Sequence, residues 1–395
     1  MKDEKKAPKL RFKGFTDDWE QCKLGDVAGI VGGGTPSTKK SEYWNGNINW
    51  FTPAEIGNQI FVSHSQKKIT ELGLLKSSAK ILPAGTILFT SRAGIGNTAI
   101  LTRNACTNQG FQSIVPYSNK LDSYFIYSES AKLKRYGETM GSGSTFTEVS
   151  GKQMKKMSLH IPNINEQAKI GNMLKILDRT ITLHEEKKRQ LERLKSALLQ
   201  KMFADKSGYP DIRFEDFSGE WEQCKLGNVA KITMGQSPNS KNYTDNPKDR
   251  ILVQGNADMK DGQVHPRIWT TEITKTANKG DLILSVRAPV GDIGKTSYDV
   301  VIGRGVAAIK GNEFIFQLLK RMKAVGYWTK YSTGSTFESI NSLEINNAVI
   351  NLPKEHEQNE VGNILSYVDH AITLQNYKIK LVKKLKSSLL QKMFI

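Results

Sequence analysis

The chain reads RFKGFTDDWEQCKLGDVA at residues 11–28 and repeats this stretch as RFEDFSGEWEQCKLGNVA at residues 213–230, with 12 of the 18 positions identical at an offset of 202. A second pair follows at an offset of 191, LKSALLQKMF at 194–203 and LKSSLLQKMF at 385–394. The segments between these matched edges differ strongly. A tandem repeat with matched edges and divergent middles predicts one scaffold that carries two different recognition surfaces.

Length and charge restrict the class of protein. A chain of 395 residues is long enough for two or three domains with hydrophobic cores. Its 57 Lys and Arg against 39 Asp and Glu give a net charge of +18, which points to a polyanionic partner, and first to nucleic acid. No apolar run approaches the roughly 18–20 residues of a membrane span, and the start lacks the apolar core of a signal peptide. We therefore expect a cytoplasmic protein without a membrane partner.

The three cysteines, Cys22, Cys106 and Cys224, are too few for a disulfide scaffold and lack the CxxC spacing of zinc sites. Cys22 and Cys224 are repeat equivalents beside Trp19 and Trp221, so we expect them to pack in hydrophobic cores. This cysteine usage fits a reducing cytoplasm.

Both halves of the chain have the same order of segments. A WEQCKLG segment is followed by a region of short apolar runs bounded by Gly or Pro, which is typical of strands and turns, and then by a long helix. The predicted fold class is α+β, a tandem pseudo-two-fold repeat of two mixed α/β domains joined by two long antiparallel helices. The predicted division is a first recognition domain at 1–163, a first long helix at 164–204, a linker at 205–212, a second recognition domain at 213–355 and a second long helix at 356–395.

Apolar residues recur in both helices with the alternating spacings of four and three that are typical of a coiled-coil seam. The seam of the first helix includes Leu174, Leu177, Ile181, His184, Leu191 and Leu198, and that of the second includes Leu365, Val368, Ile372, Gln375, Val382 and Leu389. Each helix of about 38 residues would be roughly 57 Å long, and its simplest partner is its own repeat. Antiparallel packing would bring His184 and Gln375 together at the seam midpoints. Such a polar pair can fix the register. The alternative, which the sequence leaves open, is that His184 faces solvent.

The basic surplus lies mainly outside the helices. Residues 164–203 carry +4 and residues 357–394 carry +3, which leaves +11 of the +18 for the rest of the chain. The charge is therefore more than a solvated helix face.

The motifs of the common nucleotide-dependent and metal-dependent enzymes are absent from the sequence. There is no NPPY-like tetrad for amino methylation, no FxGxG loop and no HExxH, and the histidines lack metal-ligand spacing. GDIGKT at 291–296 imitates the end of a P-loop, but Pro289 stands where that motif needs Gly. GGGT at 32–35 and GSGS at 141–144 lack the GxGxxG pattern and are expected to be turns. We therefore expect no catalytic, cofactor or metal site in this chain.

Several loop segments are rich in the side chains that read base edges and hold phosphates. The candidate DNA-binding residues of the first domain are Ser37, Thr38, Lys39, Tyr43, Trp44, Arg92, Asn97, Asn108, Gln109, Ser144 and Thr145. Those of the second domain are Gln236, Ser237, Asn239, Lys241, Gln254, Asn256, Arg287, Arg304, Ser335 and Thr336.

An offset of 195 aligns Arg92 with Arg287 and Gln109 with Arg304. The shared arginine is either a clamp on a phosphate or base, or one partner of a structural salt bridge, and both readings stay open. The exchange of Gln109 for Arg304 is of the kind that changes a preferred base. GSTF, which occurs at 143–146 and 334–337, either lets backbone approach a phosphate or caps the next short element, and we favour the cap.

The ordered set of WEQCKLG, TPST…EYW, SRAGIGN, NQGFQ, GSTF, the NEQ or HEQ helix start and LLQKMF resembles the DNA-specificity subunit of type I restriction-modification enzymes. The resemblance covers nearly the whole chain, and its specificity comes from the ordered, doubled set rather than from any one motif. The second half departs from the first, with SPNSKNY in place of TPST…EYW and GRGVA in place of NQGFQ. Such departures are expected if the two domains read different sequences.

The resemblance implies a non-catalytic subunit in which each target recognition domain reads one half of a bipartite, asymmetric site in double-stranded DNA. The paired helices would set the gap between the half-sites. Two methyltransferase subunits, which carry S-adenosylmethionine, would dock on the repeated surfaces and methylate an adenine in each half-site after flipping it out of the duplex. Restriction subunits, with ATP and Mg, would join the same assembly.

The sequence argues against two other classes of function. A self-sufficient methyltransferase or nuclease is disfavoured by the missing motifs. A coiled-coil protein-interaction adaptor without a DNA target is disfavoured by the +11 outside the helices.

Overall fold

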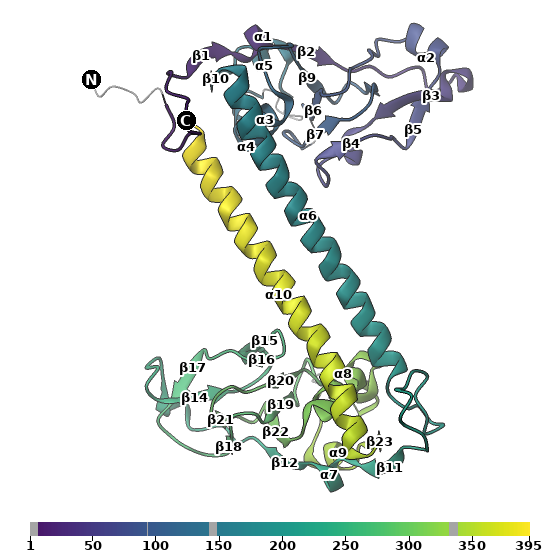
Figure 1. Ribbon diagram of the computed structural model, residues 1–395, viewed down its shortest axis with the longest axis vertical. Helices are drawn as coiled ribbons and strands as arrows, with labels where there is room; N and C mark the ends of the chain where they lie inside the picture. The colour runs from purple at the N-terminus through teal and green to yellow at the C-terminus, as the bar shows by residue number, and fades with distance from the viewer. Residues whose placement is uncertain (1–6, 93, 142–147, 332–338) are drawn as a thin grey trace. The chain divides into compact units, whose positions relative to one another are not determined.

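The computed structural model describes residues 7–92, 94–141, 148–331 and 339–395. The chain forms two compact units, unit 1 (Met1–His184 with Lys378–Ile395) and unit 2 (Glu185–Tyr377). Each unit therefore contains one stretch of both long helices, whereas the predicted boundaries set each helix apart from the recognition domains. The elements can be followed in Figure 1.

The described residues of unit 1 form ten short strands, several short helices and part of each long helix. Its strands are β1 (Glu20–Lys23), β2 (Ala28–Gly32), β3 (Trp44–Phe51), β4 (Phe61–Val62), β5 (Lys67–Ile69), β6 (Ile87–Phe89), β7 (Thr98–Leu101), β8 (Cys106–Thr107), β9 (Gln112–Pro116) and β10 (Ser158–Ile161). Its helices are α1 (Leu24–Val27), α2 (Glu71–Leu75), α3 (Ser123–Ser128), α4 (Ser130–Met140), α5 (Gly151–Lys155) and the first part of α6 (Ile164–Lys201), with 3-10 turns η1 (Ser41–Tyr43) and η2 (Pro53–Glu55).

Unit 2 has a similar order of elements with more strands. Its strands are β11 (Glu222–Lys225), β12 (Lys231–Met234), β13 (Tyr243–Thr244), β14 (Arg250–Val253), β15 (Met259–Lys260), β16 (Gln263–Val264), β17 (Ile268–Thr270), β18 (Thr276–Ala277), β19 (Leu282–Ser285), β20 (Ile293–Lys295), β21 (Val300–Ile302), β22 (Val306–Lys310) and β23 (Val349–Leu352). Its helices are α7 (Leu226–Val229), α8 (Glu313–Ala324), α9 (Ser342–Asn346) and most of α10 (Glu355–Met393), with 3-10 turns η3 (Ser240–Asn242), η4 (Asn256–Asp258) and η5 (Tyr327–Tyr331).

The two units share one sheet topology although their middle sequences differ. The larger sheet has the order β2-β9-β6-β7-β4 in unit 1, and β12-β22-β19-β20-β16 in unit 2 with β15 added at its edge. The smaller sheet has the order β5-β3-β8, which matches β17-β14-β21, and β13 and β18 extend it in unit 2. The central pair of this smaller sheet is parallel in both units. The predicted α+β repeat is confirmed, and the repeat extends through the divergent middles.

The WEQCKLG segment closes each domain in the same way. Strand β1 pairs antiparallel with β10, so that Cys22 faces Leu159, and β11 pairs with β23, so that Cys224 faces Ile350. Both cysteines pack against the hydrophobic core of their unit, as expected, although each remains half-buried. Burial raises the pKa of the Cys22 thiol to about 11, which keeps it in the inert neutral form.

A buried ion pair ties each lead-in to the start of a long helix. Arg11 donates two hydrogen bonds to Glu166, at 2.9 and 2.6 Å, and Arg213 donates two to Glu357, at 2.7 and 2.8 Å. Both glutamates are almost fully buried. The glutamate of the NEQ and HEQ motifs therefore receives the bidentate, charge-assisted bond that arginine forms best.

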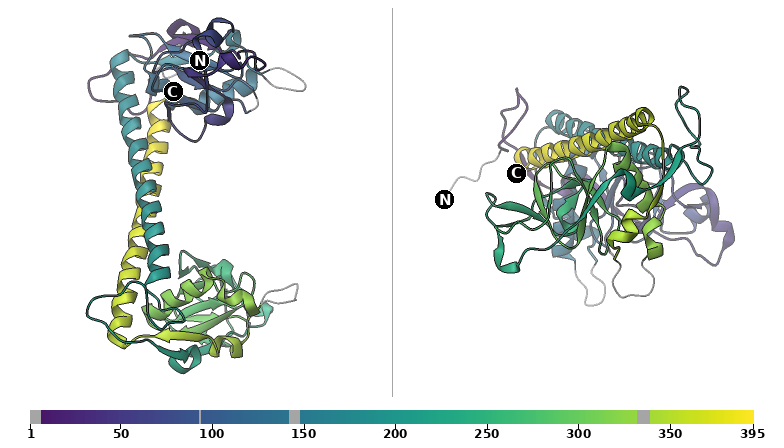
Figure 2. Two further views of the ribbon diagram at one scale, coloured as in Figure 1. Left: turned by 90° about the vertical axis from the view of Figure 1, so that its right-hand side faces the viewer. Right: turned by 90° about the horizontal axis from the view of Figure 1, so that it is seen from below.

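Within each unit the two long helices run side by side in opposite directions (Figure 2). In unit 1, Ile170 and Leu174 of α6 share a core with Met393 of α10. Asp178, which follows them in α6, forms an ion pair with Lys386, which precedes Met393 in α10. Unit 2 shows the reciprocal arrangement, because Leu198 of α6 packs on the core that holds Leu365.

Every predicted seam position is buried or half-buried in the structure. His184 and Gln375 are both half-buried, and they belong to different units, so their pairing stays a prediction. No helix within the described ranges is long and apolar enough to cross a membrane.

Candidate nucleic-acid interface

Three segments meet at the same place in both units: the chain after the first strand of the larger sheet, the turn after β6 or β19, and the turn before β9 or β22. In unit 1 the amide of Ser91 donates to the Gly110 carbonyl at 2.8 Å, and in unit 2 the amide of Val286 donates to the Gly305 carbonyl at 2.9 Å. These bonds are equivalent at the offset of 195. The loops that carry most of the candidate residues are thus held in one frame in both units.

Glycine is required where the first of these segments passes the turn before β9 or β22. A Cβ at Gly33 would lie 1.9 Å from the Asn108 carbonyl oxygen, and a Cβ at Gly235 would lie 2.1 Å from that of Gly303. Both distances are far below a van der Waals contact. The two glycines are repeat equivalents, so this close approach is a common feature that brings the predicted loops together.

Unit 2 has a hollow of about 580 Å³ where these segments meet. It is lined by five of the predicted DNA-binding residues, Ser237, Gln254, Asn256, Arg287 and Arg304. Tyr243, Ser240 and Ser285, which the sequence did not single out, complete its polar wall. Tyr243 lies in the SPNSKNY segment, which stands in place of the TPST…EYW segment that contains Tyr43, so the sequence held a signal for it.

The guanidinium groups of Arg287 and Arg304 are exposed at this hollow. Neither has a hydrogen-bond or ion-pair partner among the described residues, and the same holds for the half-buried Arg92. The backbone of Arg304 is fixed instead, because its amide donates to the Ser237 hydroxyl at 3.1 Å. The described residues therefore give no support to the structural salt-bridge reading of Arg92 and Arg287.

Gln254 brings a further donor to the hollow. Its backbone amide donates to Asp258 at 2.7 Å, but its side-chain Nε2 is buried and has no acceptor among the described residues. An unpaired buried donor is costly, by about 1–3 kcal/mol, so an acceptor from a ligand would be favourable here. Beside it, Arg267 donates to the Ala257 carbonyl at 3.0 Å and lines a neighbouring hollow of about 460 Å³. No repeat signal marked Arg267, since its counterpart at the offset of 202 is Ser65.

The corresponding place in unit 1 has the same frame with different side chains. Gln109 is exposed, and its Oε1 accepts a hydrogen bond from the Thr35 hydroxyl. Asn97 is also exposed. The Oδ1 of Asn108 accepts the Gly110 amide at 2.9 Å, so this side chain shapes the turn.

The TPST…EYW segment divides into an exposed and an inward-facing part. Ser37, Thr38 and Lys39 are exposed. Tyr43 is only 7% exposed, and the indole of Trp44 donates to the Ser37 carbonyl at 3.1 Å. The Tyr43 ring therefore offers little surface to DNA, and the Trp44 indole is anchored to the loop while remaining half-buried.

The matching loop of unit 2 presents Gln236, Asn239 and Lys241, all exposed. Glu272 accepts the Asn239 amide and the Asn242 side chain, both at 2.7 Å, and these bonds lower the pKa of its carboxyl group. The loop is thus shaped before any ligand binds.

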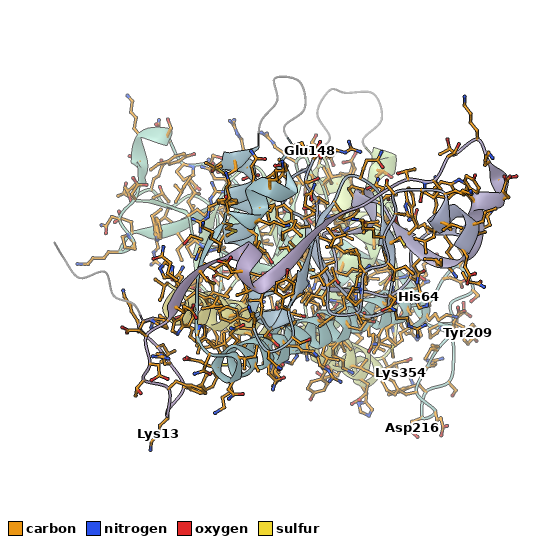
Figure 3. All side chains as sticks on the ribbon, turned by 90° about the horizontal axis from the view of Figure 1, so that it is seen from above. Lys13, His64, Glu148, Tyr209, Asp216 and Lys354 are labelled. Carbon is orange, nitrogen blue, oxygen red and sulfur yellow. The ribbon has the colours of Figure 1, made fainter. Side chains whose placement is uncertain are left out.

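The remaining candidates, Ser144, Thr145, Ser335 and Thr336, lie outside the described residues. The backbone of Arg92 forms an isolated antiparallel β-bridge with that of Glu148. Figure 3 shows Glu148 on the side of unit 1 away from Lys13. Within the described ranges, no group of three or more His, Cys, Asp and Glu side chains is placed to hold a metal ion.

Comparison with known proteins gives a consistent result. The model of the type I restriction modification DNA specificity domain matches residues 16–193 and 218–384. The type I restriction enzyme MjaIX specificity subunit of Methanocaldococcus jannaschii is 28% identical over 95% of this chain and 92% of its own length. The EcoR124I/EcoR124II specificity subunit of Escherichia coli is 32% identical over 44% of this chain and 43% of its own length. The crystal structure of the type I restriction-modification S subunit from M. genitalium superposes with a TM-score of 0.69 at 16% identity, over 98% of this chain and 99% of that one, which concerns the fold.

Proposed function

The chain belongs to the type I restriction-modification DNA specificity family, and on that basis we propose that it is the non-catalytic, sequence-reading subunit of such a system. The observation that carries this proposal is the doubled frame of loops, which presents the half-buried Arg92 and the exposed Gln109, Arg287 and Arg304 at equivalent places in the two units. Arginine and glutamine are the side chains that read guanine and adenine edges in the major groove. The +11 outside the helices supplies attraction to the phosphates.

The repeat supports a bipartite target. Each unit would read its own half-site in double-stranded DNA. The DNA sequences of the two half-sites would differ because the exposed residues of the two units differ, as at Gln109 and Arg304. The long helices α6 and α10, which contribute to both units, would set the unspecified gap between the half-sites.

A repeated apolar stripe on the long helices supports the docking of two copies of one partner. In unit 1 the exposed apolar residues that recur in the repeat are Ile176 (57%), Leu183 (61%) and Leu385 (48%). In unit 2 they are Tyr367 (74%), Leu374 (42%) and Leu194 (47%), the same positions at the offset of 191. Large apolar side chains on the solvent face of paired helices indicate an interaction site. We assign it to the methyltransferase subunits.

The chemistry of the complex would then lie on the partners. S-adenosylmethionine would bind the methyltransferase subunits, which methylate adenine, and ATP and Mg would bind the restriction subunits. The location would be the cytoplasm, with access to the chromosome.

Co-expression with the methyltransferase subunit, followed by mapping of methylated adenines on genomic DNA, tests the proposal. We expect one bipartite, asymmetric motif with a fixed gap, and no methylation when this chain is expressed alone. Methylation by the chain alone would make it an enzyme and overturn the proposal.

The second candidate, an interaction adaptor without a DNA target, is favoured only by the apolar stripe. Duplex binding separates the two functions, because phosphate contacts make log affinity fall linearly with log salt. An adaptor would show no such salt-dependent binding.

A further inference from the structure

The two units allow the contacts with DNA to be sorted by comparison. Arg92 and Arg287 are the same residue at the same place in the frame, while Gln109 and Arg304 differ at the same place. Phosphates are common to every sequence, whereas bases distinguish one half-site from the other. A residue that is the same in both units is therefore suited to bind a DNA phosphate, and a residue that differs between the units is suited to read a base.

Each of the two differing residues, Arg304 and Gln109, has a hydroxyl residue as a hydrogen-bond partner. The group that the hydroxyl bonds is not the same in the two units. In unit 2, the Ser237 hydroxyl accepts a hydrogen bond from the backbone amide of Arg304 at 3.1 Å, and the five guanidinium donors have no partner in the part of the chain that the structure describes. In unit 1, the Thr35 hydroxyl donates to the Oε1 of Gln109. The Nε2 of the same side chain is then the group of Gln109 that is more available to a ligand. The backbone at 304 is thus fixed while its side chain remains available for a ligand.

A second position also separates the two units. The residue after β14 is Gln254, and the equivalent residue after β3 is Thr52. Within the described ranges the Nε2 of Gln254 has no acceptor, whereas the Thr52 hydroxyl already donates to Glu55 at 2.8 Å. Unit 2 therefore offers unpaired donors from Arg304, Arg287 and Gln254 around one hollow.

A site lined by unpaired donors fits a ligand edge that carries acceptors. In the major groove, guanine presents O6 and N7, two acceptors and no donor, and an arginine fork matches both. Adenine and cytosine each present a donor there, which would meet the donors of the hollow. We propose that Arg304 reads a guanine in the half-site of unit 2, with Gln254 beside it, and that Arg287, like Arg92, holds a phosphate. This inference rests on the proposed function.

The test uses the complete complex with its methyltransferase subunit and the mapped target duplex. Each guanine of the two half-sites is replaced in turn by 7-deazaguanine, which pairs normally but lacks the N7 acceptor. For the wild-type chain we expect one guanine whose replacement weakens binding by about 5- to 150-fold. Arg304→Gln should lose that amount on the natural duplex and become insensitive to the replacement.

Two further variants separate the roles. Arg287→Ala should weaken binding to the natural and the substituted duplex alike and should lower the slope of log affinity against log salt by about one. Arg250→Gln, which changes an exposed arginine of unit 2 outside the lining of the hollow, is the matched control and should leave the pattern unchanged.

Equal sensitivity of wild type and Arg304→Gln at every guanine would overturn the inference while leaving the proposed function intact. Failure of the wild-type complex to prefer any sequence would instead refute the proposed function itself.

Discussion

Asp178 of α6 and Lys386 of α10 form an ion pair in unit 1, with the lysine Nζ at 2.6 and 2.7 Å from the two carboxylate oxygens. Tyr124 of α3 donates its hydroxyl to the same carboxylate at 2.8 Å, and burial together with this carboxylate raises the pKa of the tyrosine. Asp369 and Lys195 form the repeat-equivalent pair in unit 2, where Gln317 of α8 also donates to Asp369 at 2.9 Å. Each recognition domain is therefore joined to both long helices through one aspartate.

Replacing Asp178 with Ala should destabilise unit 1 by about 2–3 kcal/mol. Loss of one partner of a buried pair costs about 3–5 kcal/mol, and the lower figure applies because Lys386 keeps a quarter of its side chain exposed. Hydrogen exchange should show lost protection in α3 and in residues 164–184. Glu138→Gln, which breaks an exposed pair with Lys134 in the same unit, should change stability by less than about 0.5 kcal/mol. Equal loss of protection in unit 2 would contradict the assignment.

Introducing negative charge into the apolar stripe of one unit should abolish binding of one methyltransferase subunit and leave the other subunit bound. Leu183→Glu with Ile176→Glu acts on unit 1, and Leu374→Glu with Tyr367→Glu acts on unit 2, because these side chains are repeat equivalents on exposed helix faces. Native mass spectrometry of the co-expressed complex should show one partner copy for each double variant and none when the two are combined.

The control for the stripe is Leu75→Glu, which changes a side chain of α2 that is 78% exposed and lies away from the long helices. It should leave both partner copies bound. If both stripe variants kept two copies, docking would have to occur elsewhere.

Glu272→Gln should loosen residues 237–243 and weaken the half-site read by unit 2 alone. The lowered pKa of Glu272, caused mainly by the Asn239 amide, means that its contribution is present above the ordinary carboxyl pKa and is lost as pH falls through the lower value of the folded state. Protection of this loop against hydrogen exchange should therefore stay constant from pH 8 to 5 in the wild type. Reduced protection in the variant at pH 7 would confirm the role, and unchanged protection would refute it.

The sequence predicted the architecture well because the repeat and the seam are local patterns. The spacing of Leu174, Ile181 and Leu365 by itself specifies which helix face is buried, and all three are buried. The offset of 195 also predicted that Arg92 and Arg287 occupy one place in a common frame, which the backbone hydrogen bonds show. These features need no knowledge of long-range packing.

The candidate site was less predictable because it depends on which side of a loop faces the core. Tyr43 and Trp44 have the composition of a nucleic-acid contact, yet the ring of Tyr43 is buried and Trp44 is half-buried at the start of β3. Asn108 has a side chain that can read a base, but its side-chain Oδ1 accepts the backbone amide of Gly110 in the turn. The Nε2 of Gln254 is unpaired because no acceptor lies near it among the residues that the structure describes, and no local sequence pattern reports this.

Lengthening both long helices should lengthen the gap between the half-sites without changing either half-sequence. Four residues, about one turn of roughly 6 Å, are inserted after His184 in α6 and after Tyr377 in α10, at the two boundaries between the units, so that the packing within each unit is retained. At about 3.4 Å per base pair this corresponds to roughly two additional base pairs. Methylated-adenine mapping should show the two half-sequences unchanged and the spacing increased. Replacing four residues at the same positions without insertion is the control and should keep the original spacing. An unchanged gap in the lengthened variant would show that the helices do not set the spacing.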